Sequence, residues 1–332
     1  MQLAAVRAIK AHLRTLAPQT VDLASELFRA IPFPSVSIGI AYGQAPGDFK
    51  LAVRYRDPEW NALSAERVLH WLTRSADTVG IPLSAADIDA QHTGPVHAIA
   101  LADSAGGGDG NPLHIGSSVS HFQTRAGTLG FFARSVDDHT KGFVSANHVI
   151  AMLDDAAPND PIVHPGGSET NPTVGRFHHC VHLRVNGERF VDAAFATLAT
   201  EHFDPSSLPG GKHLKPTLAQ LGPQPLAVAK FADGTGETHG HVVSFDFDTF
   251  RVLSYGPHLN RVPFENQLEV ESTVAAKRFS EPGDSGSLVY DDNQQAVGLL
   301  FAHSLQGGAF NHGFSYVNPI SRVLSDLRVE PL

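Results

Sequence analysis

The stretch 279–289 constrains the chain most, because it places Gly283-Asp284-Ser285-Gly286 directly before a short apolar run. Glycine adopts backbone angles that are closed to other residues, so Gly283 permits a tight turn that aims successive N–H groups at one point. A serine hydroxyl beside such donors can act as a nucleophile once a base takes its proton. We therefore predict Ser285 as the nucleophile, with the N–H groups of Gly283 and Ser285 as oxyanion donors. The alternative is an ordinary turn that joins two strands.

The histidine that best suits this serine is His148. The chain has nineteen histidines, so context must choose among them. His148 lies in the apolar stretch 142–150, directly after small residues. This pattern predicts an imidazole at the rim of a sheet, where it can serve as a general base. The alternative is a rim or core histidine whose ring bonds only to backbone groups.

The carboxylate predicted to orient His148 is Asp192, a lone acid inside the apolar stretch 189–196. A buried carboxylate is costly unless it is paired, and an imidazole N–H would pair it well. The alternative is an exposed acid on an edge strand. Along the chain the order is His148, Asp192, Ser285, which is one of the orders in which such triads occur.

With these motifs, residues 111–332 resemble the trypsin-like (chymotrypsin-fold) serine peptidases. The motifs that carry this resemblance are 145–148, 192–194 and 283–286. The chain is also similar to the trypsin-like proteins related to the plant narrow-leaf protein and its bacterial relatives. That second similarity lies in 116–121, 126–130, 147–149, 234–240 and 279–287. The resemblance implies a cytoplasmic serine-peptidase domain of two β-barrels behind a small N-terminal α/β domain.

The resemblance also implies where a substrate would bind. The strand after the nucleophile, expected at 296–303, would line the cleft and accept an extended peptide as an added strand. Its end makes Phe301, Ala302 and His303 predicted pocket residues.

Phe279, six residues before the serine, is the remaining predicted pocket residue. A tryptic pocket would need an acid there, so phenylalanine argues against cleavage after Lys or Arg and suggests a small or apolar preference. The chain also lacks the Ile-Val-Gly-Gly start that secreted zymogens liberate, so Asp284 has no evident new N-terminus to pair with.

Residues 1–104 are predicted to form the N-terminal α/β domain. Apolar periodicity predicts its helices, alternation predicts its strands, and a short Gly/Pro connection predicts that the first two strands form an antiparallel hairpin. The expected helices are 3–30 and 64–79, and the expected strands are 36–42, 49–56 and 96–101. None of these residues forms a catalytic pattern, so we expect this domain to regulate, to recruit substrate or to assemble. The Gly-rich residues 105–112 are the predicted linker.

Residues 113–332 contain short apolar runs separated by turn signals, the pattern of an all-β domain. We predict one barrel at about 113–200 and a second at about 224–318. Residues 201–223, rich in Pro and Gly, would connect the barrels, and 319–327 would form a closing helix. The expected fold class is therefore mixed: a small N-terminal α/β domain, then an all-β double barrel with a C-terminal helix.

Composition excludes several classes of function. The net charge of −10 and the absence of a Lys/Arg cluster argue against a general nucleic-acid binder. No run approaches the ~18 apolar residues of a membrane span, and Arg7 and Lys10 interrupt what would be the apolar core of a signal peptide. The single cysteine, Cys180, allows no intrachain disulfide and fits a reducing compartment. We expect a cytoplasmic protein.

One stretch suggests a metal. Strand alternation would place His178, Cys180 and His182 on one face. Zinc sites usually take four suitable ligands with recognised spacing, and a fourth is lacking here. We therefore predict no metal and no cofactor.

These observations predict an intracellular serine endopeptidase that hydrolyses peptide bonds through an acyl-enzyme. Its partners would be a protein or peptide substrate and, through the N-terminal domain, a regulatory protein or a second copy. The alternative is a non-catalytic module on the same fold that binds a peptide or partner in the cleft.

Overall fold

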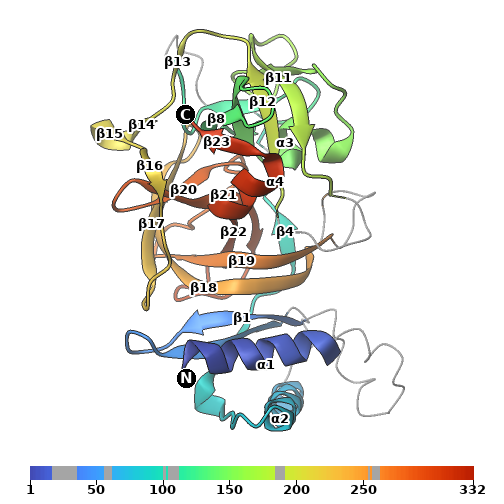
Figure 1. Cartoon of the computed structure of the whole chain (residues 1–332), viewed down its shortest axis with the longest axis vertical. Coiled ribbons are helices and arrows are strands. Elements are labelled where there is room, and N and C mark those ends of the chain that lie inside the picture. Colours follow the sequence, from blue (N-terminus) through green and yellow to red (C-terminus); the bar gives the residue numbers. More distant parts are fainter. Residues whose placement is uncertain are drawn as a thin grey trace.

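The computed structural model describes residues 1–16, 36–55, 62–99, 102–103, 112–183, 191–252, 255 and 262–332. The described part is mostly β, with two large sheets stacked along the long axis of the molecule (Figure 1). Helices are few, and none of them in these residues combines the length and apolarity needed to cross a membrane.

The smaller sheet corresponds to the first predicted barrel. Its strands follow the order β23-β8-β9-β12-β11-β10-β6-β7. Their bounds are β6 Ser118–His121, β7 Gly127–Thr128, β8 Phe131–Ser135, β9 Lys141–Ser145, β10 Pro161–Val163, β11 Thr173–Cys180, β12 Ala194–Leu198 and β23 Val329–Pro331. The short helix α3 (Asn147–Ile150) follows β9 directly.

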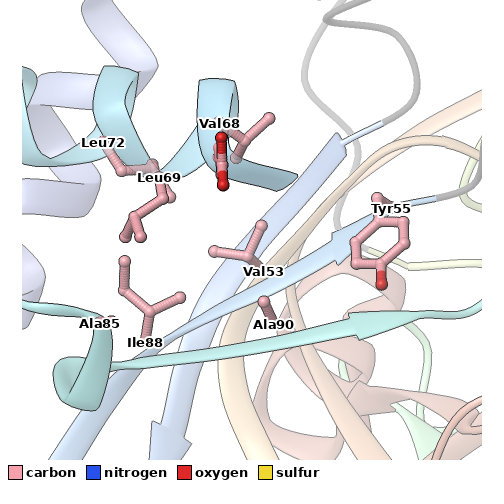
Figure 2. A pocket seen from close by; sticks show the side chains of 9 residues that line it. Val53, Tyr55, Val68, Leu69, Leu72, Ala85, Ile88 and Ala90 are labelled. Carbon is pink, nitrogen blue, oxygen red and sulfur yellow. The ribbon is translucent and has the colours of Figure 1, made fainter. Parts of the chain in front are cut away.

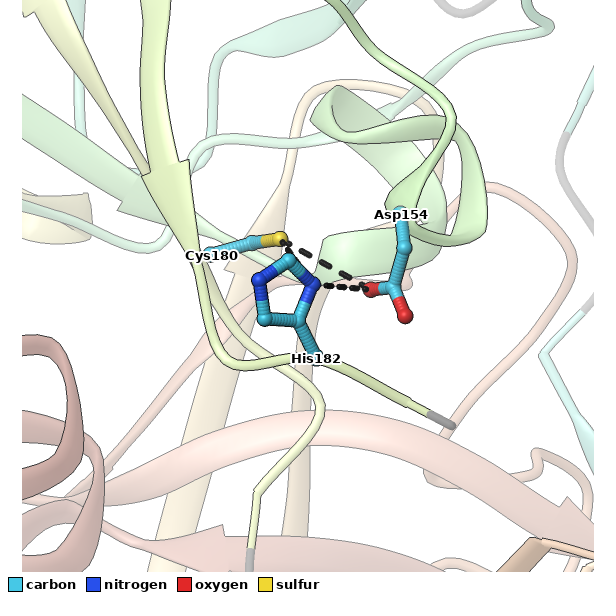
Figure 3. A group of neighbouring side chains, drawn as sticks. All are labelled: Asp154, Cys180 and His182. Carbon is cyan, nitrogen blue, oxygen red and sulfur yellow. Dashed lines mark hydrogen bonds and ion pairs between the residues drawn. The ribbon is translucent and has the colours of Figure 1, made fainter. Parts of the chain in front are cut away.

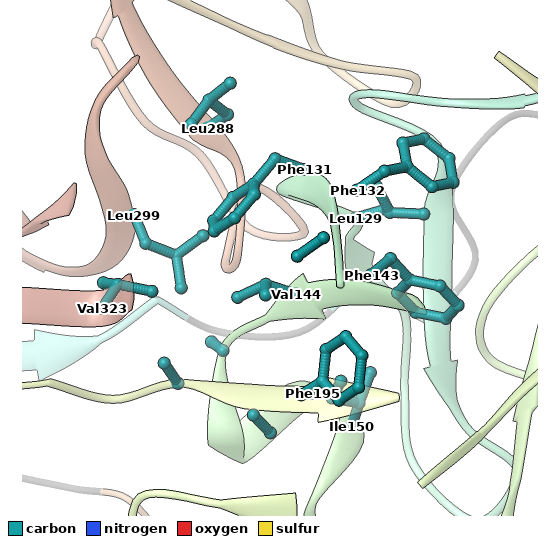
Figure 4. Close-up of a cluster of buried hydrophobic side chains, with 14 of the residues drawn as sticks. Leu129, Phe131, Phe132, Phe143, Val144, Ile150, Phe195, Leu288, Leu299 and Val323 are labelled. Atoms are coloured by element: carbon teal, nitrogen blue, oxygen red, sulfur yellow. The ribbon is translucent and has the colours of Figure 1, made fainter. Parts of the chain in front are cut away.

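The core of this sheet is built from large apolar side chains on β8, β9 and β12 (Figure 4). Phe131, Phe143 and Phe195 are fully buried there, and each contributes roughly 1.5–3 kcal/mol by leaving water. Leu299 of the second sheet and Val323 of the C-terminal helix belong to the same cluster. The two sheets are therefore joined by a shared apolar core.

The larger sheet corresponds to the second predicted barrel and continues into the N-terminal strands. Its main path is β17-β20-β21-β22-β19-β18-β1-β2-β3, and β16 and β4 each pair with β21. Its bounds are β1 Val36–Tyr42, β2 Phe49–Tyr55, β3 Ile88–His92, β4 Val96–Ala98, β16 Lys215–Leu218, β17 Leu226–Ala232, β18 Gly236–Val252, β19 Val262–Ser272, β20 Leu288–Asp291, β21 Gln295–Ser304 and β22 Ser315–Pro319.

Short strands between the barrels complete the β structure. β5 (Leu113–His114) pairs in parallel with β13 (Phe203–Asp204). β14 (Ser207–Leu208) pairs antiparallel with β15 (Lys212–His213).

The N-terminal hairpin was predicted and is present, but it has a second partner. β1 and β2 pair antiparallel from Val36↔Tyr55 to Tyr42↔Phe49. β1 also pairs with β18, so the hairpin extends the sheet of the second barrel. β2 pairs in parallel with β3, a strand that the sequence did not predict, and α2 (Ala62–Thr78) forms the crossover between them.

Helix α1 (Leu3–Leu16) covers the face of this N-terminal layer, with α2 beside it (Figure 1). Val6, Ile9 and Leu13 of α1 are buried in one cluster with Val242 of β18 and Val270 of β19. One apolar core thus runs from the N-terminal helices into the second barrel. The predicted helix 3–30 extends past Leu16 into residues outside the described part.

The remaining N-terminal predictions have different outcomes. The strand expected at 96–101 is present as β4, but it pairs with β21 instead of the N-terminal hairpin. The linker expected at 105–112 lies, apart from residue 112, outside the described residues. A domain boundary there stays a prediction.

The C-terminal end crosses to the first barrel. The predicted closing helix is α4 (Ile320–Leu327), and Ile320, Val323 and Leu327 are its buried positions. After it, β23 pairs antiparallel with β8. The last strand of the chain therefore completes the sheet of the first barrel.

Candidate active site

The predicted base and carboxylate lie together because their strands are neighbours. Ala194 at the start of β12 pairs with Ser145 at the end of β9. Asp192 stands two residues before the first position, and His148 three residues after the second. The Nδ1 of His148 lies 2.6 Å from Asp192 Oδ2, and the His148 backbone N–H donates to Asp192 Oδ1 at 3.3 Å. Asp192 is fully buried.

Ser285 completes this arrangement. The Nε2 of His148 is hydrogen-bonded to Ser285 Oγ. When Nδ1–H donates a hydrogen bond to the Asp192 carboxylate, Nε2 carries a lone pair and can accept the serine proton. The chain therefore brings the three predicted residues into one hydrogen-bonded line, with the donor and acceptor roles that proton transfer needs.

Asn318 near the end of β22 fixes the backbone of Asp192 from the second barrel. Its Oδ1 accepts the backbone N–H of Asp192 at 2.9 Å, and its Nδ2 donates to Gln267 Oε1 at 2.6 Å. Both side chains are fully buried. Asn318 was not among the predicted site residues, since nothing in an isolated strand end indicates a partner 126 residues away.

The turn that carries Ser285 requires the glycines on both sides of it. Gly283 has φ +97° and Gly286 has φ +89°, a region that other residues rarely adopt. A Cβ on Gly286 would also lie 2.3 Å from Ser145 Oγ and 2.4 Å from the Thr128 carbonyl oxygen. Thr128 holds the turn by donating its Oγ1–H to the Gly283 carbonyl at 2.7 Å and its N–H to the Ser285 carbonyl at 2.8 Å.

Asp284 has a partner that the sequence analysis missed. Lys230 in the middle of β17 places Nζ 2.5 Å from Asp284 Oδ2, and both side chains have no exposed surface. Thr235 Oγ1 donates to Asp284 Oδ1 at 2.5 Å. Burial lowers the pKa of the Lys230 ammonium, and the Asp284 carboxylate opposes that shift. A lysine inside the apolar strand 226–232 was the available signal.

The predicted pocket residues do not share one environment. Phe279 is buried in the cluster that holds the N-terminal helices, whereas the Phe301 side chain packs 4.7 Å from the Phe264 ring in another cluster. Ala302 is fully buried. His303 is half-buried, and burial, with smaller effects from Arg278 and His97, lowers its pKa to about 4.

The predicted His178, Cys180 and His182 set is not brought together. A bulge between Phe177 and His179 breaks the alternation of β11, and His178 Nδ1 instead lies 2.7 Å from His179 Nδ1. Cys180 and His182 lie beside Asp154 (Figure 3).

The Asp154 carboxylate already accepts two short hydrogen bonds. Asn147 Nδ2 donates to Oδ1 at 2.7 Å, and the Leu183 N–H donates to Oδ2 at 2.8 Å. Burial, together with the Asp154 charge, raises the pKa of the Cys180 thiol to about 12. Through the hydrogen bond from Asn147 to Asp154, this cluster braces the residue next to His148.

An apolar pocket of about 330 Å³ lies between α2 and the strands β2 and β3 (Figure 2). Leu69 and Leu72 of α2 line one side, and Val53 and Ile88 line the other. None of the predicted site residues lines it.

No protein-family model matches the chain, and no curated protein does. Matching solved structures include Thermobifida fusca Protease A and Cellulomonas bogoriensis chymotrypsin, each 16% identical, with TM-scores of 0.45, covering 66% of this chain and 98% of theirs. A glutamic acid specific serine protease is 18% identical, with a TM-score of 0.46, covering 66% of this chain and 100% of its own. The relation to the narrow-leaf protein stays a prediction.

Proposed function

We propose that this chain is a serine endopeptidase of the trypsin-like fold, acting through His148, Asp192 and Ser285. The observation that carries the proposal is the continuous line of hydrogen bonds from the Asp192 carboxylate through both ring nitrogens of His148 to Ser285 Oγ. A structural serine in a turn needs no such base, and a structural histidine needs no buried carboxylate on its far nitrogen.

In the proposed reaction His148 takes the proton of Ser285 as Oγ attacks a substrate carbonyl carbon, and then delivers it to the leaving amine. Asp192 keeps Nδ1 protonated and stabilises the imidazolium that forms. The N–H groups of Gly283 and Ser285 would receive the oxyanion, because the positive φ of Gly283 turns the backbone there. Water then releases the acyl group by the reverse sequence of proton transfers.

The proposed substrate is an extended peptide that adds to the edge of β21. Phe279 would favour a small or apolar residue before the cut and disfavour Lys or Arg. The non-catalytic binding module, the cytoplasmic location and the regulatory or self-association role of the N-terminal region remain predictions from the sequence.

A fluorophosphonate probe tests the proposal directly, since it phosphonylates an activated serine with loss of fluoride. The native chain is expected to be labelled at Ser285, and Ser285→Ala is expected to lose the label and to lower any peptidase turnover by about 10⁴-fold or more. The matched control is Ser325→Ala, which removes an exposed hydroxyl from α4 and should leave labelling unchanged.

Peptide mapping of the labelled protein identifies the modified residue. A label that persists in folded Ser285→Ala would contradict the assignment. The absence of label in both the native chain and Ile99→Asp would also contradict it. Ile99 lies next to Ser285, and this substitution is expected to expose the serine.

A further inference from the structure

The cleft edge of β21 is already occupied by a segment of the same chain. β4 pairs antiparallel with β21, with Ala98 opposite Ala302 and His97 opposite His303. The next residue, Ile99, donates its N–H to the Phe301 carbonyl at 3.0 Å. An extended peptide substrate would need this same edge. Residues 96–99, here called the cleft strand, therefore lie where the proposed substrate would lie.

The cleft strand reaches the nucleophile with a carbonyl group. The carbonyl oxygen of Ile99 lies 3.3 Å from Ser285 Oγ. The hydroxyl has one proton, so when that proton goes to His148 the oxygen lone pairs are left facing the Ile99 carbonyl group. The Ile99 carbonyl group therefore lies directly beside the nucleophile.

The Ile99 side chain occupies an apolar site. It is 1% exposed and belongs to the cluster that contains Phe279, the predicted pocket residue. Burial of this isoleucine side chain helps to hold the cleft strand in place.

The chain is also held on the far side of that carbonyl. Ala102 and Ala126 exchange two backbone hydrogen bonds of 2.9 Å each. A Cβ on Gly283 would lie 3.1 Å from the Ala102 Cβ, so Ala102 passes close to the serine turn. The described residues on the two sides of this point, Ile99 and Ala102, are thus each held by backbone hydrogen bonds.

We propose that the chain cuts itself on the carboxyl side of Ile99. This inference rests on the proposed function and names its substrate class: an extended segment with an aliphatic residue at the cut. Ser285 Oγ attacks the Ile99 carbonyl carbon while His148 takes the proton. The bond to the nitrogen of Ala100 breaks, and His148 protonates that amine. Water then hydrolyses the Ile99 ester, leaving one carboxylate, one amine and a regenerated serine.

Both fragments remain in one particle after the cut. Residues 1–99 are held by the β1–β18 ladder and by the ion pair between Arg54 and Glu269, which are fully buried. The cut is therefore visible under denaturing conditions and invisible by native size.

Intact-mass measurement of the purified full chain over time tests the inference. We expect the mass of residues 1–99 and a second fragment whose N-terminal sequence is Ala100-Leu101-Ala102. Because the cleft strand is part of the same chain, the rate should be first order and unchanged by a tenfold dilution. Ser285→Ala should remain intact, also when mixed with the native chain.

Two substitutions of Ile99 test whether its side chain is recognised at the cut, independently of whether the protein folds. Ile99→Asp puts a carboxylate in the apolar site, so cleavage should fall at least tenfold while fluorophosphonate labelling of Ser285 becomes faster. Ile99→Leu keeps an aliphatic side chain and should still be cut. Thermal melting confirms that each variant is folded.

The outcomes distinguish the two proposals. Labelling of Ser285 with no cut after Ile99 in the native chain, or a cut only elsewhere, overturns self-cleavage and leaves the peptidase proposal standing. No cut, together with no label in either the native chain or folded Ile99→Asp, removes the peptidase proposal itself.

Discussion

The N-terminal strands join the sheet of the second barrel, and the C-terminal strand joins the sheet of the first. The ion pair at the N-terminal attachment is buried, whereas the one at the C-terminal attachment is exposed. The N-terminal strand β1 joins the second barrel, and Arg54 on β2 donates to Glu269 on β19 with exposed fractions of 1% and 0%. The C-terminal strand β23 joins the first barrel, and Arg328 pairs with Asp137 with exposed fractions of 63% and 60%. An arginine–carboxylate pair is thus buried at one end and exposed to water at the other.

This difference in burial indicates how much free energy is needed to detach each end from its barrel. Removing one partner of a buried pair leaves an uncompensated charge, whereas water replaces a lost exposed partner. The N-terminal end has a second such contact, since Lys10 Nζ lies 3.0 Å from Asp248 with both side chains nearly buried. Detaching this end is therefore costly, and it is the end that continues into the cleft.

The largest expected effect comes from removing the buried cation. Arg54→Met should lower the free energy of unfolding by about 3–5 kcal/mol, because Glu269 is left charged and unpaired without exposed surface. Arg328→Met is the matched variant and should leave the free energy almost unchanged. Urea titration measures both, and equal losses at the two ends would break the comparison.

The second prediction separates stability from access to Ser285. Leu13→Ala on α1 and Leu327→Ala on α4 each remove a fully packed side chain from a different core. Each should cost about 2–5 kcal/mol. Only Leu13→Ala should also speed fluorophosphonate labelling, because it loosens the end that carries the cleft strand. Similar acceleration in both variants would show that the two ends are coupled to the site alike.

The smallest expected effect is a pH dependence of the cleft strand. Burial lowers the pKa of His97 and, with Arg278 and His97, lowers that of His303 to about 4. Groups with depressed pKa values bind protons more readily once they are exposed, so stability is lost as pH falls below about 6.5 toward 4. Opening of the β4–β21 pair should therefore increase by up to about tenfold per pH unit.

Hydrogen exchange of a peptide that covers residues 96–99, corrected for intrinsic rates, measures this opening between pH 7 and pH 5. His303→Gln removes one of the two titrating groups and should flatten the response. An opening rate that is independent of pH in the native chain would argue against this coupling.

The sequence predicted those parts of the molecule whose signals are local. The hairpin β1–β2 follows from alternation and a short turn, and α4 follows from its apolar stripe. His148, Asp192 and Ser285 could be placed together because chemistry requires the three side chains and their chain order is restrictive. Their placement in a hydrogen-bonded line needed no knowledge of the sheet order.

What could not be predicted depends on pairings between distant segments. Residues 96–98 were correctly read as a strand, yet alternation does not tell which edge a strand will join, and the edge was that of β21. Lys230 and Asn318 show the same limit for side chains. A polar residue in an apolar strand indicates that a hydrogen-bond partner is needed, but the sequence does not identify that partner. The bulge in β11, invisible in the sequence, separated His178 from Cys180 and His182.

The Lys230–Asp284 pair ties the serine turn to the interior of the second barrel. Lys230, the cation that pairs with Asp284, lies in the middle of β17. Its position is set by the pairing of that strand and does not involve either end of the polypeptide. A new N-terminus released by cleavage would therefore not be needed to pair with Asp284, because Lys230 already does so. Residues 96–99 lie along β21 beside Ser285, so access to that hydroxyl depends on whether this segment of the chain moves away.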